Sequence, residues 1–367
     1  MKIDLTTIDR ENFIVAEHIW NGETLYLVIP NHIGAKFTKD TMIFRSSVWN
    51  SAGQLVSASF PKFFNFGEHP ELTPLPTSLN DAVLMEKLDG STLIVSKYKG
   101  KFIIRTRGTI DASLMELNGH EVEQLMVKYP KIKEYMNGHP GDTCDFSLIF
   151  EWVSPLNQIV IRYEDADIKL IGMISHHDYS LWSQSNLDLV AIELNVGRPQ
   201  TFQFNTIEEM LVSIEALKGQ EGIVVYFNNG QSLLKCKGSW YLALHRMKSE
   251  LANIDGVVEL FMSLGGKMTY NEFYQHIVDT FDYELAEQVR GFVSKVCDAN
   301  KEAQLIIQGM KDFIDYKVVY LKTRKEQALL IMSAYGNTTR SGMLFKILDG
   351  NTLDSKDIKK LIFQCLK

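Results

Sequence analysis

The sequence lacks the features that mark secreted, membrane-spanning or zinc-binding proteins. Its 367 residues include only four cysteines, Cys144, Cys236, Cys297 and Cys365, which lie far apart and form no CxxC spacing. There is no run of about 18 apolar residues, and the first residues carry acids where a secretory signal would have an apolar core. We therefore expect reduced thiols, no structural metal, no membrane segment and a cytoplasmic location.

The chain also lacks an excess of basic residues. It has 38 Lys and Arg against 45 Asp and Glu, a formal net charge of −7, which argues against a surface that binds nucleic acid everywhere. One stretch, residues 97–107, differs because it contains five basic residues and no acid. On strands, lysines that recur every second residue project from one face and could follow a phosphate backbone. The RNA-binding candidates are therefore Lys97, Lys99, Lys101, Arg105 and Arg107. A solvated hairpin whose lysines protect a sheet edge explains the same residues.

Hydrophobic patterning divides the chain into two expected domains, because 367 residues exceed what one core usually serves. Up to residue 245, β-rich runs alternate with turns and a few helices, which predicts antiparallel sheets with flanking helices. The expected strands are 23–30, 40–50, 54–60, 92–98, 101–108, 145–153, 158–163, 168–175, 222–227 and 231–237, and the expected helices are 111–136 and 206–219.

The second range, 246–367, reads as helices throughout. Thr269 followed three residues later by Glu272 is a capping-box pattern, and Phe273, Ile277 and Phe281 then recur every four residues. The predicted fold class is therefore α+β: a domain of antiparallel sheets and flanking helices over 1–245, followed by an all-α domain over 246–367.

The stretch EKLDGSTLI, residues 86–94, places a lysine just before an Asp-Gly pair and a β-rich run. Asp-Gly between apolar runs is a common hairpin turn, which would leave Lys87 as a solvated strand residue. Alternatively, the Lys87 amine is a nucleophile toward phosphate, Gly90 allows close backbone approach to a ligand, and Asp89 and Ser91 supply polar contacts. The four-residue pattern alone does not decide between these alternatives.

Five further stretches place charged residues among strand-forming neighbours. They are MIFRSSVW with Arg45, FPKFFNFGE with Lys62 and Phe64, LIFEWV with Glu151, QEGIVVYF with Glu221, and LLKCKGSWY with Lys235 and Lys237. Taken singly, each has a plain alternative: a surface ion, a turn acid, or the wet face of a hairpin. Glu151 is the hardest to explain in this way, because an acid inside an apolar strand needs solvent or a specific partner.

Together these residues suit the transfer of a nucleotide to a lysine. The attacking amine must be uncharged, and the nearby cations Lys235 and Lys237 would disfavour its protonated form. The same two cations would stabilise the charge that develops on the phosphate. Glu221 could support a divalent ion, and Glu151 could accept hydrogen bonds from ribose hydroxyls.

The sequence resembles the covalent nucleotidyltransferases, a superfamily that includes polynucleotide ligases and mRNA capping enzymes. KLDGS (87–91) resembles the nucleophile motif, and FEWV (150–153), EGIVV (221–225) and LLKCKGSWY (233–241) follow in the same order. PKFFNFGE, FEWVSPLNQIVI and KCKGSWYLALH make the resemblance closest to the bacteriophage RNA ligase 1 family. This resemblance runs from about residue 45 to residue 245.

The resemblance implies an ATP-dependent RNA ligase that joins RNA 5′-phosphate and 3′-hydroxyl ends through a lysine-AMP intermediate and an adenylylated RNA end, with Mg²⁺ or Mn²⁺ as cofactor. Lys87 would be the nucleophile, Arg45 and Glu151 would hold the ribose, and Lys62 the phosphates. The implied ATP site comprises Arg45, Lys62, Phe64, Lys87, Asp89, Gly90, Glu151, Glu221, Lys235 and Lys237. The implied catalytic residues are Lys87, Lys235, Lys237 and Tyr241, and Glu221 is the implied metal ligand.

Two positions depart from the family pattern. Ser46 follows Arg45 where the family often has glycine, so the local backbone is expected to differ. No acid in GGKMTYNEF can be matched to a metal-binding acid of the family's helical domain, which leaves a second metal site unassigned.

The helical range 246–367 favours an RNA ligase over a DNA ligase or a capping guanylyltransferase, which usually carry a small β-barrel there. The resemblance implies that this range is an RNA-specificity module, that broken tRNA is a candidate substrate, and that the role is RNA repair. A monomer in the cytoplasm is expected, the host cytoplasm if a phage encodes the protein. The remaining alternatives are a DNA ligase or capping enzyme that uses the same lysine, and a non-catalytic RNA-binding protein of the same fold.

Overall fold

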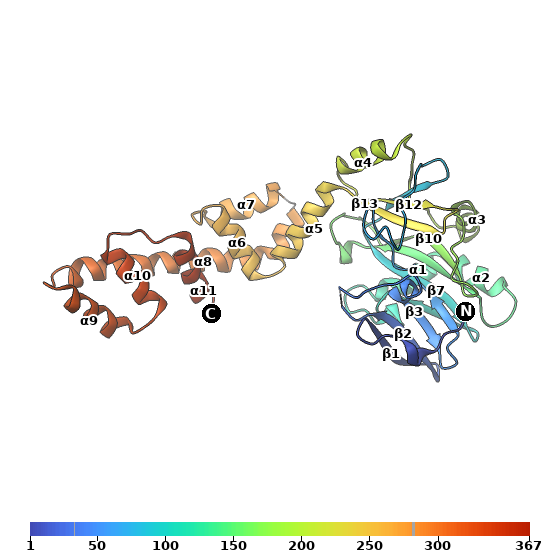
Figure 1. Ribbon diagram of the computed structural model, residues 1–367, viewed down its shortest axis with the longest axis horizontal. Coiled ribbons are helices and arrows are strands. Elements are labelled where there is room, and N and C mark those ends of the chain that lie inside the picture. Colours follow the sequence, from blue (N-terminus) through green and yellow to red (C-terminus); the bar gives the residue numbers. More distant parts are fainter. Residues whose placement is uncertain (33, 281–282) are drawn as a thin grey trace. The chain divides into compact units, whose positions relative to one another are not determined.

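The computed structural model describes residues 1–32, 34–280 and 283–367. The chain forms two compact units, residues 1–245 and 246–367. The first contains all the strands of the described ranges and the second only helices (Figure 1). This mixed architecture confirms the α+β class, whereas the functions expected of the two ranges remain predictions.

Three sheets build the first unit. The first has the order β1-β2-β3-β4, with β1 Phe13–Trp20, β2 Glu23–Pro30, β3 Ser47–Asn50 and β4 Leu55–Ala58. The second has the order β10-β9-β7-β8, with β7 Ser91–Tyr98, β8 Lys101–Arg105, β9 Phe146–Val153 and β10 Asp167–Ser175. The third has the order β11-β6-β12-β13-β5, with β5 Phe64–Asn65, β6 Val83–Lys87, β11 Thr201–Phe202, β12 Gly222–Phe227 and β13 Ser232–Lys237. The pairings are antiparallel except for β5 with β13.

The helices of the first unit cover the outer faces of the second and third sheets. They are α1 His120–Lys128, α2 Lys131–Gly138, α3 Gln184–Leu194, α4 Ile207–Glu215 and α5 Ser239–Leu251, and α5 crosses the division between the units. One core joins α1, α2 and α3 to the second sheet, another joins α4 to the third, and a third core draws residues from all three sheets. The sheets therefore face one another across a shared interior.

Several local predictions are wrong for identifiable reasons. The expected strand 40–50 begins as a short 3₁₀ helix, Met42–Arg45, before β3. Residues 158–163 form no strand, because the Asp89 carboxylate accepts hydrogen bonds from the backbone N–H groups of Val160 and Ile161. The expected helix 111–136 is divided into a 3₁₀ turn, Ala112–Leu114, and the helices α1 and α2, which Pro130 separates. Strand β1 was not predicted.

Asp89-Gly90 is not a hairpin turn either. Strand β6 pairs with β11 and β12 in the third sheet, whereas β7 pairs with β8 and β9 in the second. The segment 88–90 therefore carries the chain from one sheet to another. The predicted hairpins at 51–53, 99–100 and 228–230 are confirmed by the antiparallel pairs that flank them.

The second unit is a helical domain. Its helices are α6 Ile254–Ser263, α7 Tyr270–Thr280, α8 Tyr283–Phe313, α9 Arg324–Tyr335, α10 Thr339–Leu348 and α11 Ser355–Cys365, with a π-helical turn at Ile314–Val318. The capping box predicted at Thr269 and Glu272 starts α7, and Phe273 and Ile277 lie in the core; Phe281 lies outside the described residues. Within the described ranges, every helix is too short or too polar to cross a membrane.

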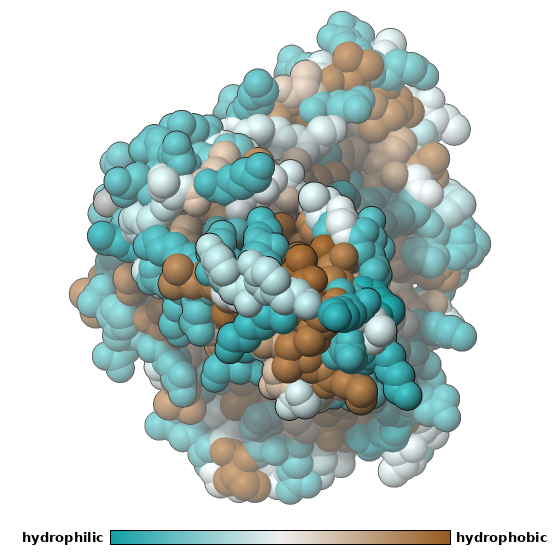
Figure 2. Space-filling view, turned by 90° about the vertical axis from the view of Figure 1, so that its left-hand side faces the viewer, coloured by the Kyte–Doolittle hydropathy of each residue, from teal (hydrophilic) through white to brown (hydrophobic). Residues whose placement is uncertain are grey.

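One surface at the end that carries α9 and α10 is more apolar than its surroundings. Figure 2 looks onto this end and shows apolar side chains ringed by hydrophilic ones. The exposed large apolar side chains of α9 and of the turn before it include Val319, Leu329 and Met332. Exposed patches of this kind commonly mark contact surfaces.

Candidate active site

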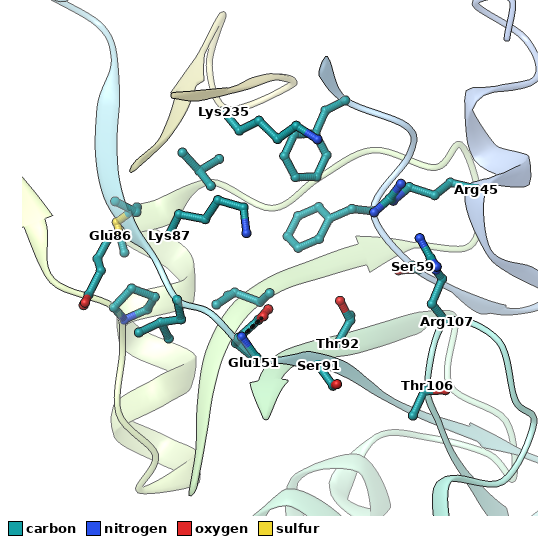
Figure 3. Close-up of a pocket in the computed structure, with 18 of the residues that line it drawn as sticks. Arg45, Ser59, Glu86, Lys87, Ser91, Thr92, Thr106, Arg107, Glu151 and Lys235 are labelled. Atoms are coloured by element: carbon teal, nitrogen blue, oxygen red, sulfur yellow. Dashed lines mark hydrogen bonds between the residues drawn. The ribbon is translucent and has the colours of Figure 1, made fainter. Parts of the chain in front are cut away.

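A pocket of about 430 Å³ opens between the sheets of the first unit. Of the residues expected from the sequence, it is lined by Arg45, Lys87, Gly90, Glu151, Lys235 and Lys237, together with Arg107 from the basic stretch. Figure 3 shows the side chains of Lys87, Lys235, Arg45 and Arg107 directed into one space from different segments. Residues distant in sequence thus form one cationic pocket whose volume is typical of small-molecule sites.

Strand alternation explains why these charges share the pocket. On β6, Met85 belongs to the core shared by the three sheets, and Lys87 follows two residues later on the same face. Ile149 and Glu151 are related in the same way on β9. Each strand therefore has a face that is apolar inside the core and polar where it reaches the pocket.

Strand β13 follows the same rule. Leu233 lies in the shared core, and Lys235 and Lys237 extend the same face into the pocket. Cys236 points to the opposite face, into the core beneath α4, and Leu234, two residues earlier on that face, is also buried.

Glu221 lies between two of the pocket lysines. Its Oε2 is 2.8 Å from Lys87 Nζ and its Oε1 is 2.8 Å from Lys237 Nζ. The carboxylate is almost fully buried, with 2% of its surface exposed. A buried carboxylate is tolerated when both oxygens are paired in this way, so Glu221 fixes the positions of both amines.

The opposite side of the pocket is strongly cationic. Burial, reinforced by Arg107, lowers the pKa of Arg45 to about 10. Burial and the neighbouring cations, first Arg45 and then Lys62, lower the pKa of Lys235 to about 8. Like charges that are held together and partly dehydrated favour an anionic ligand, because the ligand's charge relieves their repulsion.

Two adjacent phenylalanines at the start of β5, Phe63 and Phe64, point to different sides of the chain. Phe63 lines the pocket, and Lys235 Nζ lies 5.7 Å from the centre of its ring. Phe64 is buried, and its ring instead faces Lys62 Nζ at 5.2 Å. Phe64, which was expected at the nucleotide site, is thus not part of the pocket lining, whereas Phe63 is.

Lys62 stands beside the pocket lining. Its Nζ lies over the rings of Phe37 and Phe64. Burial first, and Arg45 second, lower the pKa of Lys62. The charge of Lys62 acts on the pocket residue Lys235. To contact a phosphate bound in the pocket, the flexible Lys62 side chain would have to turn toward it.

Asp89 stabilises the site from a buried position outside the pocket lining. Its Oδ2 accepts hydrogen bonds from the N–H groups of Val160 and Ile161 at 2.7 and 2.8 Å, and its Oδ1 accepts one from the Tyr241 hydroxyl at 2.7 Å. Asp89 and Tyr241 are both buried. Asp89, which was expected to contact ATP, does not line the pocket, and both of its carboxylate oxygens accept hydrogen bonds from the protein.

Gly90 is required by the neighbouring strand. A Cβ at this position would lie 2.4 Å from the carbonyl oxygen of Trp152 on β9. The Gly90 N–H donates a hydrogen bond to Glu151 Oε1 at 3.1 Å. Close approach of the backbone to β9, together with this bond, places Gly90 at the pocket wall.

Glu151 is a carboxylate with a strongly altered affinity for protons. Burial raises its pKa to about 7, opposed mainly by the positive charge of Lys87. Its side chain enters the pocket from β9 (Figure 3). Near neutral pH, Glu151 can thus either accept or donate a hydrogen bond to a ligand hydroxyl.

The basic stretch 97–107 does not present a cationic face. Lys97 is buried and donates to the carbonyl oxygens of Met136 and Gly141, and Lys99 pairs with Glu23 at 2.7 Å. Arg105 is fully buried and bonded within the protein. Lys97 and Arg105, both predicted to contact RNA, are therefore bonded within the protein, because Lys97 packs against the end of α2 and the residues that follow it, and Arg105 against Ser46 and Ser57. Lys101 is exposed, and Arg107 lines the pocket.

Sequence reasoning missed Glu86, Thr92 and Arg198 among the pocket residues. Thr92 pairs across strands with Glu151, so a correct prediction of this strand pairing would have placed Thr92 at the pocket. Arg198 carries no local signal: its loop is positioned by bonds from its guanidinium to Asp188, Gln184 and the carbonyl oxygen of Leu170.

Comparison with known proteins identifies related sequences and folds. A putative RNA ligase of Thermovibrio ammonificans is 28% identical over 210 residues, covering 56% of this chain and 53% of that protein. An RNA ligase of Rhodothermus phage RM378 is 27% identical over 314 residues, covering 66% and 68%. A putative bifunctional polynucleotide kinase/RNA ligase of Autographa californica nuclear polyhedrosis virus is 26% identical over 223 residues, covering 57% and 31%. The chain thus spans about a third and about half of the lengths of two of these relatives.

Among solved structures, an archaeal ATP-dependent RNA ligase is 12% identical with a TM-score of 0.47, covering 92% of this chain and 93% of that chain. An RNA ligase of Naegleria gruberi is 15% identical with a TM-score of 0.40, covering 63% and 76%. A family model described as RNA ligase matches residues 41–251, more than half of the chain and the whole of the pocket described above. The chain belongs to this family, the phage RNA ligase 1 family of RNA ligases.

Proposed function

We propose that the protein is an ATP-dependent RNA ligase that seals RNA 5′-phosphate and 3′-hydroxyl ends through an AMP adduct on Lys87. The observation that carries the proposal is the pocket itself, where the Lys87 amine meets Arg45, Arg107 and Lys235 in a chain of the RNA ligase family. A cationic pocket around a primary amine suits a phosphorylated co-substrate, and ATP supplies one with a good leaving group.

In the first step, Lys87 Nζ attacks the α-phosphorus of ATP. A nitrogen–phosphorus bond forms, the bond from phosphorus to the bridging oxygen breaks, and pyrophosphate leaves with that electron pair. The amine must lose its protons on the way, and its partner Glu221 lies 2.8 Å from Nζ. The adduct nitrogen carries no positive charge, so the reaction removes one of the two cations that pair with Glu221. Lys237 keeps that carboxylate paired throughout.

The remaining cations have separate tasks in this proposal. Lys87 and Lys237 both pair with Gly222, on the two strands that flank β12, and Lys235 lies on the same face of β13 as Lys237. Both lysines of β13 therefore line the pocket on the side of Lys87, which suits them to the α-phosphate. Arg45 and Arg107 act on each other as like charges, and guanidinium pairs bind phosphate oxygens well. We assign this pair to the β- and γ-phosphates, in place of the ribose contact expected for Arg45.

The nucleoside would be held by Glu151 and Phe63. The Glu151 carboxyl faces the pocket and can hydrogen-bond to ribose hydroxyls. Phe63 supplies an aromatic face at the pocket wall.

A divalent ion, Mg²⁺ or Mn²⁺, fits this site as a companion of the nucleotide. Mg²⁺ keeps several waters and usually needs only one or two carboxylates when phosphates are its other ligands. Among the described residues there is no cluster of three or more potential protein ligands, and Glu221 is the carboxylate placed to hold the ion or its waters. When bound, the ion would neutralise charge on the phosphates.

The later steps pass AMP from Lys87 to the 5′-phosphate of RNA, after which the 3′-hydroxyl attacks that phosphate and displaces AMP. The helical unit 246–367 is proposed to select the RNA, with broken tRNA as a candidate and RNA repair as the role. The relatives whose names carry RNA ligase activity include phage and baculovirus proteins, which supports RNA as the substrate class over DNA.

The decisive experiment uses ATP labelled at the α-phosphate, with Mg²⁺, and detects label that survives denaturation. Wild-type protein should become labelled, and Lys87→Ala should not, because it lacks the nucleophile. Chelation of the divalent ion should abolish labelling and its return should restore it. Labelled wild type should lose its AMP to RNA that carries a 5′-phosphate.

Lys2→Ala is the matched control, since it removes a lysine outside the pocket. Folded wild type that takes no label from ATP or GTP, and is not already adenylylated, would contradict the proposal. Label from GTP instead would favour a capping enzyme, and transfer to DNA ends alone would favour a DNA ligase. RNA binding without any adduct would indicate a non-catalytic RNA-binding protein.

A further inference from the structure

Next to the pocket residues Arg45 and Arg107 lies a buried arginine, Arg105, that the proposed reaction does not use. Arg105, the last residue of β8, is fully buried. Its Nε donates to Ser57 Oγ at 2.8 Å, and its Nη1 donates to Ser46 Oγ at 2.6 Å and to the carbonyl oxygen of Thr106 at 3.1 Å. Its Nη2 donates to the carbonyl oxygens of Ser46 and Ser57 at 3.3 and 3.2 Å.

This guanidinium has neutral partners only. In the part of the chain that the structure describes, no carboxylate forms an ion pair with Arg105. A buried cation without a counter-ion is costly, and residues of this kind are retained where their full set of hydrogen bonds serves a purpose. Burial lowers the pKa of Arg105 to about 10, so the group stays charged at neutral pH.

Two of the three residues that accept hydrogen bonds from Arg105, Ser46 and Thr106, belong to the segments that carry Arg45 and Arg107, and the third, Ser57, lies on β4. Ser46 directly follows Arg45, and Thr106 directly precedes Arg107. Ser46 closes the connection, because its hydroxyl accepts from Arg105 and donates to the carbonyl oxygen of Arg107 at 2.8 Å. The buried Arg105 guanidinium thus joins the two backbone segments that carry Arg45 and Arg107.

This connection also gives a role to Ser46, the position that departs from the family pattern. Its backbone is extended, with φ −172°, a conformation that any residue adopts. The side chain is fully buried and both of its hydrogen-bonding functions are used. A glycine here would remove one of the five hydrogen bonds of Arg105 and the one that the Arg107 carbonyl oxygen accepts from the Ser46 hydroxyl.

We propose that Arg105 is a positioning residue which, with Ser46, fixes the separation of Arg45 and Arg107 so that the pair can grip the β- and γ-phosphates of ATP. The inference rests on the proposed function, because it assumes ATP as the ligand. Arg105 touches neither the pocket nor the nucleotide in this proposal.

Arg45 and Arg107 must be held in position because their like charges repel each other. Without a ligand, the electrostatic energy of the two side chains falls when they move apart. The phosphates of ATP bind well only if both guanidinium groups stay within hydrogen-bonding distance. Small displacements of binding groups cost large factors in rate and affinity. Five hydrogen bonds from a rigid, planar group restrain two backbone segments better than a flexible amine could.

The test compares Arg105→Lys and Ser46→Ala with wild type and with Lys97→Met. Lys97 is a second buried cation of the same hairpin that is bonded only to carbonyl oxygens, but these belong to Met136 and Gly141 at the end of α2. Lys97→Met therefore matches the loss of a buried, hydrogen-bonded cation without altering the pocket arginines.

Two reactions are measured on full-length protein whose thermal unfolding has been recorded. The first is the ATP concentration that half-saturates AMP adduct formation on Lys87. The second is the sealing of chemically pre-adenylylated RNA, a substrate that carries no β- or γ-phosphate.

Arg105→Lys and Ser46→Ala should raise the half-saturating ATP concentration by about tenfold or more, while sealing of pre-adenylylated RNA stays close to wild type. Lys97→Met should lower the unfolding temperature and leave the half-saturating concentration unchanged. Folded Arg105→Lys and Ser46→Ala with wild-type ATP dependence would overturn the inference and leave the proposed function intact. Equal losses in both reactions, or the same loss in Lys97→Met, would show that Arg105 has a purely structural role. Wild type without any adduct would overturn the proposed function and this inference with it.

Discussion

Buried carboxylates show how single residues organise this site through contacts within the protein. Glu221 holds two amines and Asp89 holds a loop and the Tyr241 hydroxyl. The sequence alone could not show that either acid is bonded within the protein, because an acid beside the end of a strand could equally bind a ligand. Their partners decide what they do, and several of these come from distant parts of the chain: Lys87 is 134 positions from Glu221, and Tyr241 is 152 positions from Asp89.

Glu151 should give the stability of the protein a distinct pH dependence. Its pKa is raised from an ordinary 4.5 to about 7, mainly by burial. Between these values the folded chain holds more protons than the unfolded chain, so the free energy of unfolding falls as the pH rises through this window. Glu151→Gln removes the effect, so wild type should lose stability relative to the variant between pH about 5 and about 8.

Urea unfolding of both proteins at the two pH values measures this difference. Glu17→Gln, which removes an exposed carboxylate from β1, controls for the loss of one negative charge. Parallel stability profiles for wild type and Glu151→Gln would mean that the Glu151 carboxyl is hydrated in the folded protein. The same variant should bind ATP more weakly if Glu151 contacts the ribose.

At the scale of elements, the crossover from β6 to β7 determines where the nucleophile lies. Lys87 ends β6 in the third sheet, and within four residues β7 has begun in the second sheet. So short a connection brings the backbone against β9, and only glycine fits at the point of closest approach. The sequence KLDGS thus serves the fold and the chemistry together.

Gly90→Ala tests this crossover. The added Cβ would lie 2.4 Å from the Trp152 carbonyl oxygen, on a strand held between β7 and β10. We expect a destabilisation of roughly 1–3 kcal/mol, the usual cost of overpacking, and reduced AMP adduct formation because Lys87 is displaced. Denaturant unfolding and the labelling assay measure the two effects.

Gly138→Ala is the matched control, since a Cβ at this exposed end of α2 would meet no atom within 4 Å. If Gly90→Ala were as stable and as active as Gly138→Ala, the crossover would not constrain the nucleophile.

At the scale of the whole molecule, charge and structure differ between the two units. The first has 21 basic and 29 acidic residues, and the second has 17 basic and 16 acidic residues. The cationic pocket is therefore a local feature of an acidic unit, whereas the helical unit is nearly neutral. Long-range attraction of RNA to the first unit is weak on this basis, which favours a contribution of the second unit to RNA binding.

A fragment of residues 1–251 tests the proposed division of labour. It keeps α5 and Tyr241 whole and ends where the family match ends. We expect this fragment to form the AMP adduct, because the described pocket residues all lie within it, but to discriminate less between RNA substrates than the full chain does.

Adduct formation would show that the fragment is folded, so RNA selectivity can then be compared directly by sealing a cleaved hairpin and a single-stranded RNA. Unchanged selectivity in an adduct-forming fragment would contradict the RNA role of the helical unit.

The sequence by itself determined the α+β class, the helical character of the second unit, the hairpins and the family. Local patterns suffice for these features: strand alternation, turn residues and the nucleotidyltransferase motifs arise from short-range backbone preferences and from chemistry that needs particular residue types. Alternation also predicted that Lys235 and Lys237 share a strand face.

Only the tertiary structure decided which charges meet. Arg105 and Arg107 are two residues apart, yet one is buried beneath the pocket and the other lines it. Asp89 and Phe64 face the interior, whereas Gly90 and Phe63 line the pocket. These differences depend on how three sheets pack against one another, and the energies of burial and ion pairing come from neighbours that are distant along the chain.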